Sequence, residues 1–307
     1  MKAARIHRFG PPEVIVIDEL PRPVPADGEV LVRVGASGVA PWDAIIREGK
    51  SKVSPPPPLT LGSDLSGVVE TIGPGVTEFK KGDEVYGVTN PQFCGANAEY
   101  ALASANMIAM KPPGLSHVEA ASVPVVAVTA WQMLFEYANV VAGQTILVLG
   151  AAGNVGAYAV QLAVGAGVDV IGVARGRDSE YVRSLGAQGC LDPEAEQFEA
   201  SLTTVDAILD LVGGATAQRS LRAVKKGGIV VSVVSDQPLP ESRDYRSVFF
   251  YADVTTARLN SLSELFGKGK LRVSVGTVLP LTRIRDAHEM LAGAPHQRGK
   301  IVLTLAG

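Results

Sequence analysis

The middle of the chain reads Thr145-Ile146-Leu147-Val148-Leu149-Gly150-Ala151-Ala152-Gly153-Asn154-Val155-Gly156. The first five of these side chains are apolar or β-branched, which is typical of a strand buried in a parallel sheet. After Gly156, apolar residues recur at helical spacing at Ala159, Leu162 and Ala163. A strand, a glycine-rich turn and a helix in this order predict the first unit of a doubly wound parallel sheet.

The glycines of this turn predict a site for a phosphate group. Glycine permits a tight turn and lets the backbone approach a pyrophosphate, which then sits at the positive N-terminus of the helix. The spacing is G-x-x-G-x-x-G rather than the commoner G-x-G-x-x-G, so an ordinary tight strand–helix turn is the alternative. The residues that we expect to contact a dinucleotide here are Gly150, Ala152, Gly153, Asn154, Val155 and Gly156.

The end of the next predicted strand bears on which nicotinamide cofactor binds. An NAD site places an acid on the ribose about 20 residues after the glycines. Here the segment 174–177 holds Arg175 and Arg177, and no acid precedes Asp178. Two guanidiniums suit a 2′-phosphate, so we expect NADPH, with a solvated basic loop as the alternative.

On either side of this turn, the pattern of predicted strands and helices divides the chain into two domains. Strand and helix patterns alternate from about residue 115, with further apolar strands expected at 168–174, 207–212 and 229–234. Residues 1 to about 110 contain short β-like runs separated by Gly and Pro, which predicts a compact β-barrel-like unit. The tail near 278–305 returns to β-like runs, of which residues 300–305 are the example. The expected fold is therefore α/β. Its expected domains are 116–269, a Rossmann dinucleotide-binding domain, and 1–115 with 270–307, a β-barrel-type catalytic domain.

Composition excludes several classes of protein. The 307 residues carry 28 Lys+Arg and 31 Asp+Glu, so a surface that coats nucleic acid is not expected. The 2 cysteines cannot build a disulfide framework or a four-thiolate zinc site, which favours a reducing, cytoplasmic location. The uncharged stretch between Glu136 and Asp169 is interrupted by glycines and polar residues, so no membrane segment is expected.

Several ordered motifs give a family resemblance. They are Gly38-Val39-Ala40-Pro41-Trp42-Asp43, Leu61-Gly62-Ser63-Asp64-Leu65-Ser66-Gly67, Ile72-Gly73-Pro74-Gly75-Val76, Phe79-Lys80-Lys81-Gly82-Asp83-Glu84-Val85, Ala120-Ala121-Ser122-Val123-Pro124 and Arg298-Gly299-Lys300-Ile301-Val302-Leu303. With them, essentially the whole chain resembles the zinc-independent quinone oxidoreductase branch of the medium-chain dehydrogenase/reductase superfamily. The resemblance implies a GroES-like catalytic domain, a Rossmann domain with the cofactor in the cleft between the two, and a homodimer joined through the cofactor domains. It also implies hydride transfer from NADPH to a small electrophilic acceptor, a quinone or an activated alkene such as an enone or alkenal.

No metal is expected. Zinc-dependent relatives place a Cys near position 40 and a His near position 63, where this chain has Ala40 and Ser63. The four histidines are isolated from one another in the sequence. Without a Lewis acid to polarise a carbonyl, acceptors that take hydride readily are favoured over alcohol–aldehyde chemistry.

The resemblance also implies an acceptor pocket and further cofactor contacts. The expected pocket residues are Trp42, Ile45, Ser63, Asn90 and Thr129, and the further cofactor contacts are Thr129, Val212, Val234 and Phe250. Trp42 could stack on a flat acceptor or be a core residue, Thr129 could be a helix cap, and Phe250 could belong to an ordinary buried strand. For Asp43 we expect the N-cap of a short helix.

The sequence departs from the family where a carbonyl would be bound. Many members have Asn at the position of Ala40, and some have Tyr at that of Ile45. No general acid is therefore evident in this segment, and the proton is expected from solvent. The alternatives are a dedicated enoyl or alkenal reductase of a metabolite pathway and a weakly active NADPH-binding redox sensor. A methyltransferase is disfavoured, because the basic Arg175 stands where an acid would hold its cofactor ribose.

Overall fold

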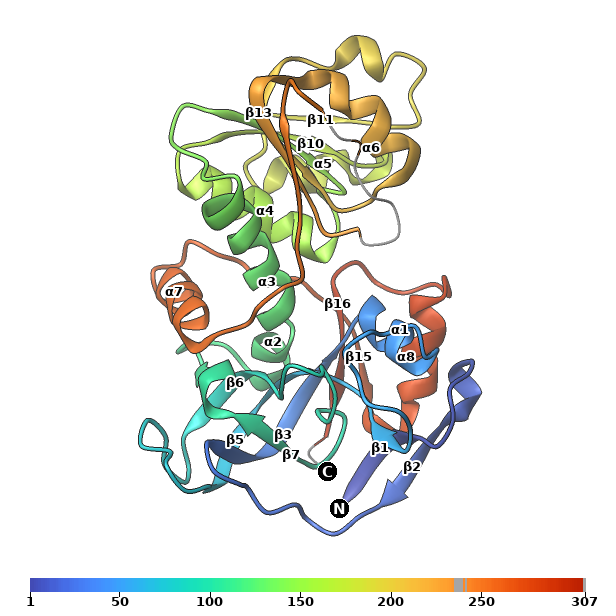
Figure 1. Cartoon of the computed structure of the whole chain (residues 1–307), viewed down its shortest axis with the longest axis vertical. Helices are drawn as coiled ribbons and strands as arrows, with labels where there is room; N and C mark the ends of the chain where they lie inside the picture. The colour runs from blue at the N-terminus through green and yellow to red at the C-terminus, as the bar shows by residue number, and fades with distance from the viewer. Residues whose placement is uncertain (235–239, 241, 306–307) are drawn as a thin grey trace. The chain divides into compact units, whose positions relative to one another are not determined.

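The computed structural model of the chain is shown in Figure 1 and describes residues 1–234, 240 and 242–305. The chain forms two compact units. The first consists of Met1–Val125 with Val254–Gly307, and the second of Val126–Asp253. Each has an apolar core of its own, built around Leu65 and Leu303 in the first unit and around Leu147 and Ile208 in the second.

The second unit is built on a six-stranded parallel sheet in the order β11-β10-β9-β12-β13-β14. The strands are β9 (Thr145–Leu149), β10 (Asp169–Val173), β11 (Gly189–Leu191), β12 (Val205–Asp210), β13 (Val224–Ser232) and β14 (Arg246–Phe249). Its helices include α4 (Asn154–Gly165), α5 (Ser179–Ser184) and α6 (Gly214–Ser220). The chain winds from β9 to one side and then returns to β12 on the other side. This confirms the doubly wound Rossmann fold and places the end of β9 at the point where the strand order reverses.

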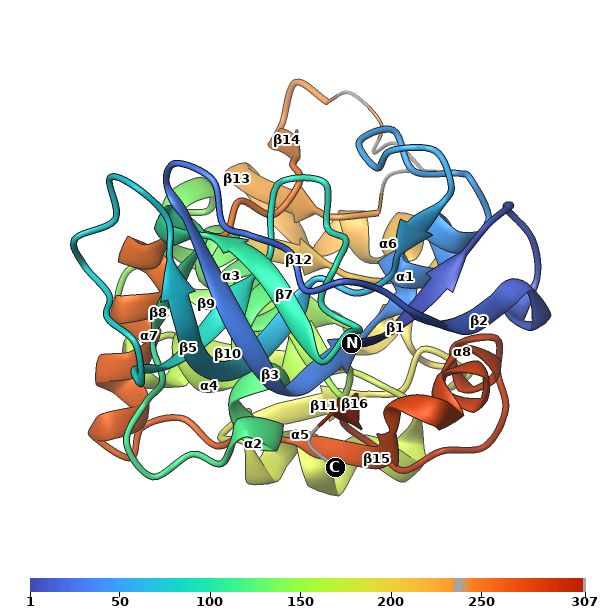
Figure 2. The ribbon, with the colours of Figure 1, turned by 90° about the horizontal axis from the view of Figure 1, so that it is seen from below.

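The first unit contains the β-rich fold that the short strand patterns predicted. A seven-stranded sheet has the order β15-β16-β3-β5-β6-β8 with β7 paired to β3, and a three-stranded sheet has the order β2-β1-β4. The strands are β1 (Lys2–Ile6), β2 (Ile15–Glu19), β3 (Glu29–Val39), β4 (Leu59–Thr60), β5 (Asp64–Ile72), β6 (Glu84–Val88), β7 (Tyr100–Ser104), β8 (Ile108–Met110), β15 (Val275–Pro280) and β16 (Lys300–Thr304). Its helices are α1 (Pro41–Arg47), α2 (His117–Ala121), α7 (Thr256–Gly267) and α8 (Ile284–Leu291). Figure 2 shows this unit with β3 and β5 side by side.

The unit boundaries differ from the expected ones, because residues 116–125 and 254–269 belong to the first unit. Tertiary contacts explain the difference for α7. The Tyr86 hydroxyl on β6 donates to the Leu259 carbonyl at 2.7 Å, and the Thr256 hydroxyl donates to the Ile108 carbonyl at 2.6 Å. These bonds tie the helix to the β-rich unit, although its sequence pattern continues the helical texture of the other unit.

The carboxy-terminal stretch contains a helix that the sequence analysis missed. Residues 278–305 were expected to be β-like, but α8 lies between β15 and β16. Its buried face is formed by Ile284, Ala287 and His288, which have the i, i+3, i+4 spacing of an amphipathic helix. Among the helices of the described residues, none is long and apolar enough to cross a membrane.

Candidate functional site

The glycine-rich turn follows β9 and leads directly into α4. Gly150 has a φ of +78°, which favours glycine, and the N–H groups of Gly150 and Ala151 both donate to the Val173 carbonyl of β10. Helix α4 begins at Asn154, and Gly153 before it supplies no side-chain cap. The first N–H groups of a 12-residue helix are therefore free of a capping side chain and aim away from the helix, which is the arrangement that binds a phosphate.

The packing at Gly156 keeps this helix end close to the strand. A Cβ at Gly156 would lie 2.2 Å from the Gly150 carbonyl oxygen and 2.7 Å from the Ala151 Cα, both of them backbone atoms. A Cβ at Gly153 would lie 3.3 Å from the same Gly150 oxygen. The turn is thus a shallow cradle that side chains would fill, and its residues fit the pyrophosphate of a dinucleotide.

The two arginines lie at the same edge of the sheet. Because β9 and β10 are parallel and pair Leu149 with Val173, the residues that follow Val173 emerge beside the glycine turn. The Arg175 side chain is 62% exposed and its Nε lies 3.6 Å from a Glu194 oxygen, while the Arg177 side chain is 74% exposed. Both guanidiniums are accessible to an anion, and their predicted contact with a 2′-phosphate stays a prediction.

A buried aspartate that the sequence analysis missed organises the neighbouring strand ends. Asp210 ends β12, and one of its carboxylate oxygens accepts from the N–H groups of Gly213, at 2.8 Å, and Val212, at 3.1 Å. Its other oxygen accepts from the Ser232 hydroxyl, whose oxygen accepts from the Val234 N–H. The Val212 side chain reaches to 2.8 Å from where a Cβ at Gly150 would lie. The structure therefore brings predicted Val212 to the glycine turn. An acid directly after the apolar run Ala207-Ile208-Leu209 was the signal that could have found Asp210.

Thr129 and Phe250 are buried side chains of the second unit. Thr129 is buried on α3 (Pro124–Trp131). The Phe250 ring is also buried and stacks on Tyr137 with ring centroids 4.3 Å apart. Phe250 thus packs as a core ring, and the predicted contacts of both residues with the cofactor stay predictions.

In the first unit, two of the predicted pocket residues meet. Trp42 is on α1, Ser63 lies just before β5, and the Trp42 indole Nε1–H donates to the Ser63 Oγ at 3.0 Å. The Trp42 side chain is only partly buried, and Ile45 one turn later on α1 is 43% exposed. Helix α1 therefore presents an apolar, partly exposed face, on which the hydrogen bond to Ser63 holds the Trp42 ring.

Asp43 was expected to be an N-cap, and that prediction is wrong. Helix α1 begins at Pro41, because proline presets the φ of a first helical residue, so Ala40 is the N-cap residue and Asp43 stands in the third helical position. The Asp43 carboxylate accepts from the Ala40 N–H at 2.8 Å. The side chain is fully buried, one of its oxygens has no hydrogen-bond partner, and burial raises the pKa of Asp43 to about 7.

A buried ion pair lies beside this helix and was also missed. The Lys300 Nζ donates to an Asp64 oxygen at 3.0 Å, and each side chain is 1% exposed. The other Asp64 oxygen accepts from the Val125 N–H at 2.9 Å. Burial raises the pKa of Asp64, and Lys300 and the Val125 amide oppose that rise. The Lys300 Nζ also lies 4.4 Å from the centre of the Trp42 ring, so the ion pair belongs to the same site.

Asn90 uses its side chain within its own loop. Its amide donates to the Cys94 carbonyl at 2.8 Å, and its oxygen accepts from the Gln92 N–H at 3.0 Å. The Ser54 hydroxyl donates to the Gln92 carbonyl, so the proline-containing loop at 51–58 contacts this loop. No recorded bond joins Asn90 to Trp42 or Ser63, and its place in the pocket stays a prediction.

The chemistry of the described residues offers no metal-binding group. Across 1–234, 240 and 242–305, no three His, Cys, Asp or Glu side chains come close enough together to hold a metal ion. Ala40 is buried and Ser63 is bonded to Trp42, so neither position presents a zinc ligand.

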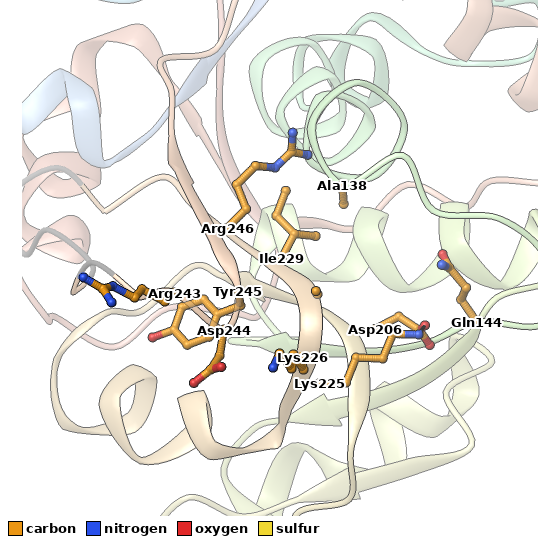
Figure 3. Close-up of a pocket in the computed structure, with 12 residues that line it drawn as sticks. Ala138, Gln144, Asp206, Lys225, Lys226, Ile229, Arg243, Asp244, Tyr245 and Arg246 are labelled. Atoms are coloured by element: carbon orange, nitrogen blue, oxygen red, sulfur yellow. Dashed lines mark hydrogen bonds and ion pairs between the residues drawn. The ribbon is translucent and has the colours of Figure 1, made fainter.

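The second unit contains a cavity of about 590 Å³, whose lining residues are shown in Figure 3. It is lined by Gln144, Asp206, Lys225, Lys226, Arg243 and Asp244, among others. These residues come from the amino-terminal ends of β9, β12, β13 and β14, whereas the glycine turn is at the carboxyl end of β9. Ligands of doubly wound sheets bind at the carboxyl ends, so the glycine turn is the better candidate site.

Comparison with known proteins agrees with this geometry. Residues 26–114 match the alcohol dehydrogenase GroES-like domain family, and residues 185–303 match a family described as zinc-binding dehydrogenase. A quinone oxidoreductase from Sus scrofa is 31% identical over 325 residues, which cover 99% of this chain and 98% of that protein.

Solved structures are also similar to the whole chain. A quinone oxidoreductase from Coxiella burnetii is 32% identical, with a TM-score of 0.91 over 100% of this chain and 99% of that one. A mycobacterial protein whose structure contains NADPH is 28% identical, with a TM-score of 0.88 over 99% of this chain and 100% of that one. Similarity of this extent includes both units.

Proposed function

This chain belongs to the quinone oxidoreductase family of the medium-chain dehydrogenase/reductase superfamily, and from that premise we propose that it is an NADPH-dependent reductase of quinones or activated alkenes. The family supports a nicotinamide-dependent oxidoreductase, and the choice of NADPH and of the acceptor is our proposal. The observation that carries it is the open, uncapped end of α4 beside Gly150, with Arg175 and Arg177 emerging next to it.

The residues of the second unit are assigned to cofactor binding. The N–H groups at the start of α4 hold the pyrophosphate, and Arg175 and Arg177 pair with the 2′-phosphate. The Asp210 network fixes the backbone at Val212 and Val234, which border the same edge of the sheet. When bound, NADPH supplies the hydride.

The residues of the first unit are assigned to the acceptor. Trp42 offers an aromatic surface for a flat ring, and Ser63 fixes the orientation of the indole. Ala40 and Ile45 offer no hydrogen-bond donor for a carbonyl, so this pocket acts chiefly by positioning an apolar electrophile. The proton that completes the reduction then comes from water.

The test is NADPH oxidation with a matched pair of acceptors, a simple quinone and a small α,β-unsaturated ketone, with NADH as the control. We expect NADPH to be consumed faster than NADH, and product analysis decides whether the quinone or the alkene carbon is reduced. Tight NADPH binding without turnover over a broad panel of acceptors would instead favour the weakly active redox sensor. Reduction of only one metabolite-like alkenal or enoyl compound would favour a dedicated reductase.

Assembly and location are also proposed. The edge strand β14 leads to Phe249, 42% exposed, and Tyr251, 66% exposed, which supports a homodimer joined through the second unit. Sedimentation that shows only monomer at micromolar concentration would contradict this. Cys94 and Cys190 are both free, which supports the cytoplasm as the location.

A further inference from the structure

We propose that Lys300 is a positioning residue of the acceptor pocket, which holds the Trp42 indole in place while Asp64 and Asp43 set the net charge behind the ring. The consequence is a pocket whose affinity for a flat, electron-poor ring falls when this buried cluster becomes negatively charged. This inference rests on the proposed function in one respect only, the assignment of the acceptor to Trp42.

The position of the Lys300 side chain is built into the sheet. Lys300 begins β16, and its stem crosses Gly38 on the neighbouring strand β3. A Cβ at Gly38 would lie 2.9 Å from the Lys300 Cε, 3.0 Å from the Asp64 Cβ and 2.6 Å from the Ala121 carbonyl oxygen. Only glycine at position 38 leaves room for the Lys300 side chain. The absence of a Cβ there lets the buried ammonium reach Asp64 and Trp42.

The Trp42 ring is held at two points. Its Nε1–H is bonded to Ser63, and the Lys300 ammonium lies over the ring at 4.4 Å from its centre, within the range of a cation–π interaction. A desolvated cation binds an aromatic face more strongly than an exposed one, and this ammonium is 1% exposed. One face of the indole is thus occupied, and an acceptor can use only the remaining exposed part.

The charges behind the ring nearly balance. Asp64 accepts from a donor at each of its oxygens, and these bonds to Lys300 and Val125 oppose the rise in the pKa of Asp64 that burial causes. Asp43 is the remaining acid, and Lys300 and Asp64 are the charged groups that act on it. Arg47 on the same helix is directed to Gly10, His288 and Glu48 instead.

The protonation of Asp43 therefore determines the net charge of the cluster formed by Lys300, Asp64 and Asp43. When Lys300 and Asp64 are both charged, the cluster is neutral with Asp43 protonated and carries one negative charge with Asp43 ionised. Burial raises the pKa of Asp43 to about 7, with Lys300 opposing the rise, so this change takes place near neutral pH. An added negative charge offsets the Lys300 charge and so weakens the cation–π contact that holds the Trp42 ring in place for an acceptor. Acceptor binding should weaken as the pH rises through 7.

The experiment uses Trp42 as its own reporter. The chain has 2 tryptophans, so Trp131→Phe leaves Trp42 alone. In that background we would record Trp42 emission from about pH 6 to about pH 8 and its quenching by 1,4-naphthoquinone, corrected for absorption by the quinone. Circular dichroism of each variant checks that it is folded.

The expected results separate charge from structure. Lys300→Met should shift the Trp42 emission and weaken naphthoquinone binding by about fivefold to tenfold, whereas Lys300→Arg should keep most of both. Asp43→Asn should remove the pH dependence of emission and binding and leave the protein in its tight-binding state. Lys300→Met leaves the Asp64 carboxylate without its partner cation, which can destabilise the protein by itself. The double variant Lys300→Met with Asp64→Asn removes both charges and should show the same loss of binding.

Two results would overturn the inference: a folded Lys300→Met variant that binds naphthoquinone like the parent, or a pH response that survives in Asp43→Asn. Failure of the proposed function looks different. If quenching depends on Lys300 but no acceptor oxidises NADPH, the positioning role stands and the reductase proposal fails. If NADPH is oxidised while quenching and emission ignore Lys300, the reductase stands and the positioning role fails.

Discussion

The two candidate sites, one in each unit, are built from different parts of the chain: one from backbone groups and the other from side chains. The glycine turn at 150–156 is a backbone site, because its residues are glycines and small side chains, and its working groups are N–H groups at the start of α4. The cluster around Trp42 is a side-chain site, made of groups from α1, β5 and β16 that are held by hydrogen bonds and a buried ion pair. The first site requires small side chains or none, whereas the second requires particular side chains and the bonds between them.

This difference decides how each site should fail. A backbone site tolerates no added atoms but has no titratable group of its own. A side-chain site tolerates changes of shape at its exposed rim but responds to pH and to the loss of single partners. The expected effects of substitution run from the packing of the turn, through buried charge, to individual hydrogen bonds.

The largest effect is expected from adding a methyl group at the turn. In Gly156→Ala the new Cβ would meet the Gly150 carbonyl oxygen at 2.2 Å, so α4 must move away from β9. We expect a loss of stability on the order of 3 kcal/mol, with a loss of NADPH affinity. The matched control is Gly165→Ala at the end of the same helix, where nothing lies within 4 Å of the added atom. That change should stabilise by about 0.5 kcal/mol. Equal melting temperatures for the two variants would refute the packing argument.

The stability of the first unit should depend on pH, because the unit contains buried titratable groups, whereas the glycine turn contains none. His288 on α8 is fully buried, its Nδ1 lies 2.8 Å from Arg47, and burial with the nearby Arg47 lowers the pKa of His288 from 6.5 to about 3. Below pH 6.5 the unfolded chain binds a proton that the folded protein does not. The contribution of His288 is therefore complete above pH 6.5 and declines as the pH falls toward 3.

The contribution of His288 to the free energy of unfolding should decline by about 3 kcal/mol between pH 7 and pH 4, as measured by denaturant unfolding of wild type and variant. Asp43 acts in the opposite direction, because its raised pKa lets the folded protein bind the extra proton over this range. The difference between wild type and His288→Asn isolates the histidine, since an asparagine oxygen can replace Nδ1 as the acceptor from Arg47. Parallel stability curves for the two proteins would show that His288 carries no such dependence.

How far the sequence predicted this molecule follows the same division. The sheet of the second unit and the turn after β9 were predicted, because an apolar strand and a glycine spacing are local patterns. Helix α8 was missed, and its buried face is completed by Arg47, 241 positions away. The placement of α7 in the first unit likewise depends on bonds from Tyr86 and Ile108.

The side-chain site was predicted only in part. Trp42 and Ser63 were named, but the pair Asp64 and Lys300 is separated by 236 residues, and no spacing rule connects such residues. Asp43 was given the wrong helical position, although Pro41 was a usable signal for where α1 begins. Burial and pairing are properties of the folded chain, so the charge state of these groups could not be predicted from the sequence.

A smaller effect is expected where side chains supplement the backbone site. In Arg175→Asp, a charge that repels replaces one that we propose binds the 2′-phosphate. The value of kcat/KM for NADPH should fall by about 30-fold, while that for NADH should stay within about twofold. Arg183→Asp on α5 loses the same charge at an exposed position and is the control. Equal losses for NADPH and NADH would mean that Arg175 does not distinguish the two cofactors.

The smallest effect should come from a single hydrogen bond of the side-chain site, and a double-mutant cycle can measure it. Ser63→Ala leaves the Trp42 Nε1–H without its partner, which should cost about 1 kcal/mol in stability. Trp42→Phe removes the N–H itself, so Ser63→Ala should cost little in that background. The coupling energy from four unfolding curves then reports the bond directly. A coupling near zero would mean that Ser63 does not hold the indole, and the orientation of Trp42 would then depend on Lys300 alone.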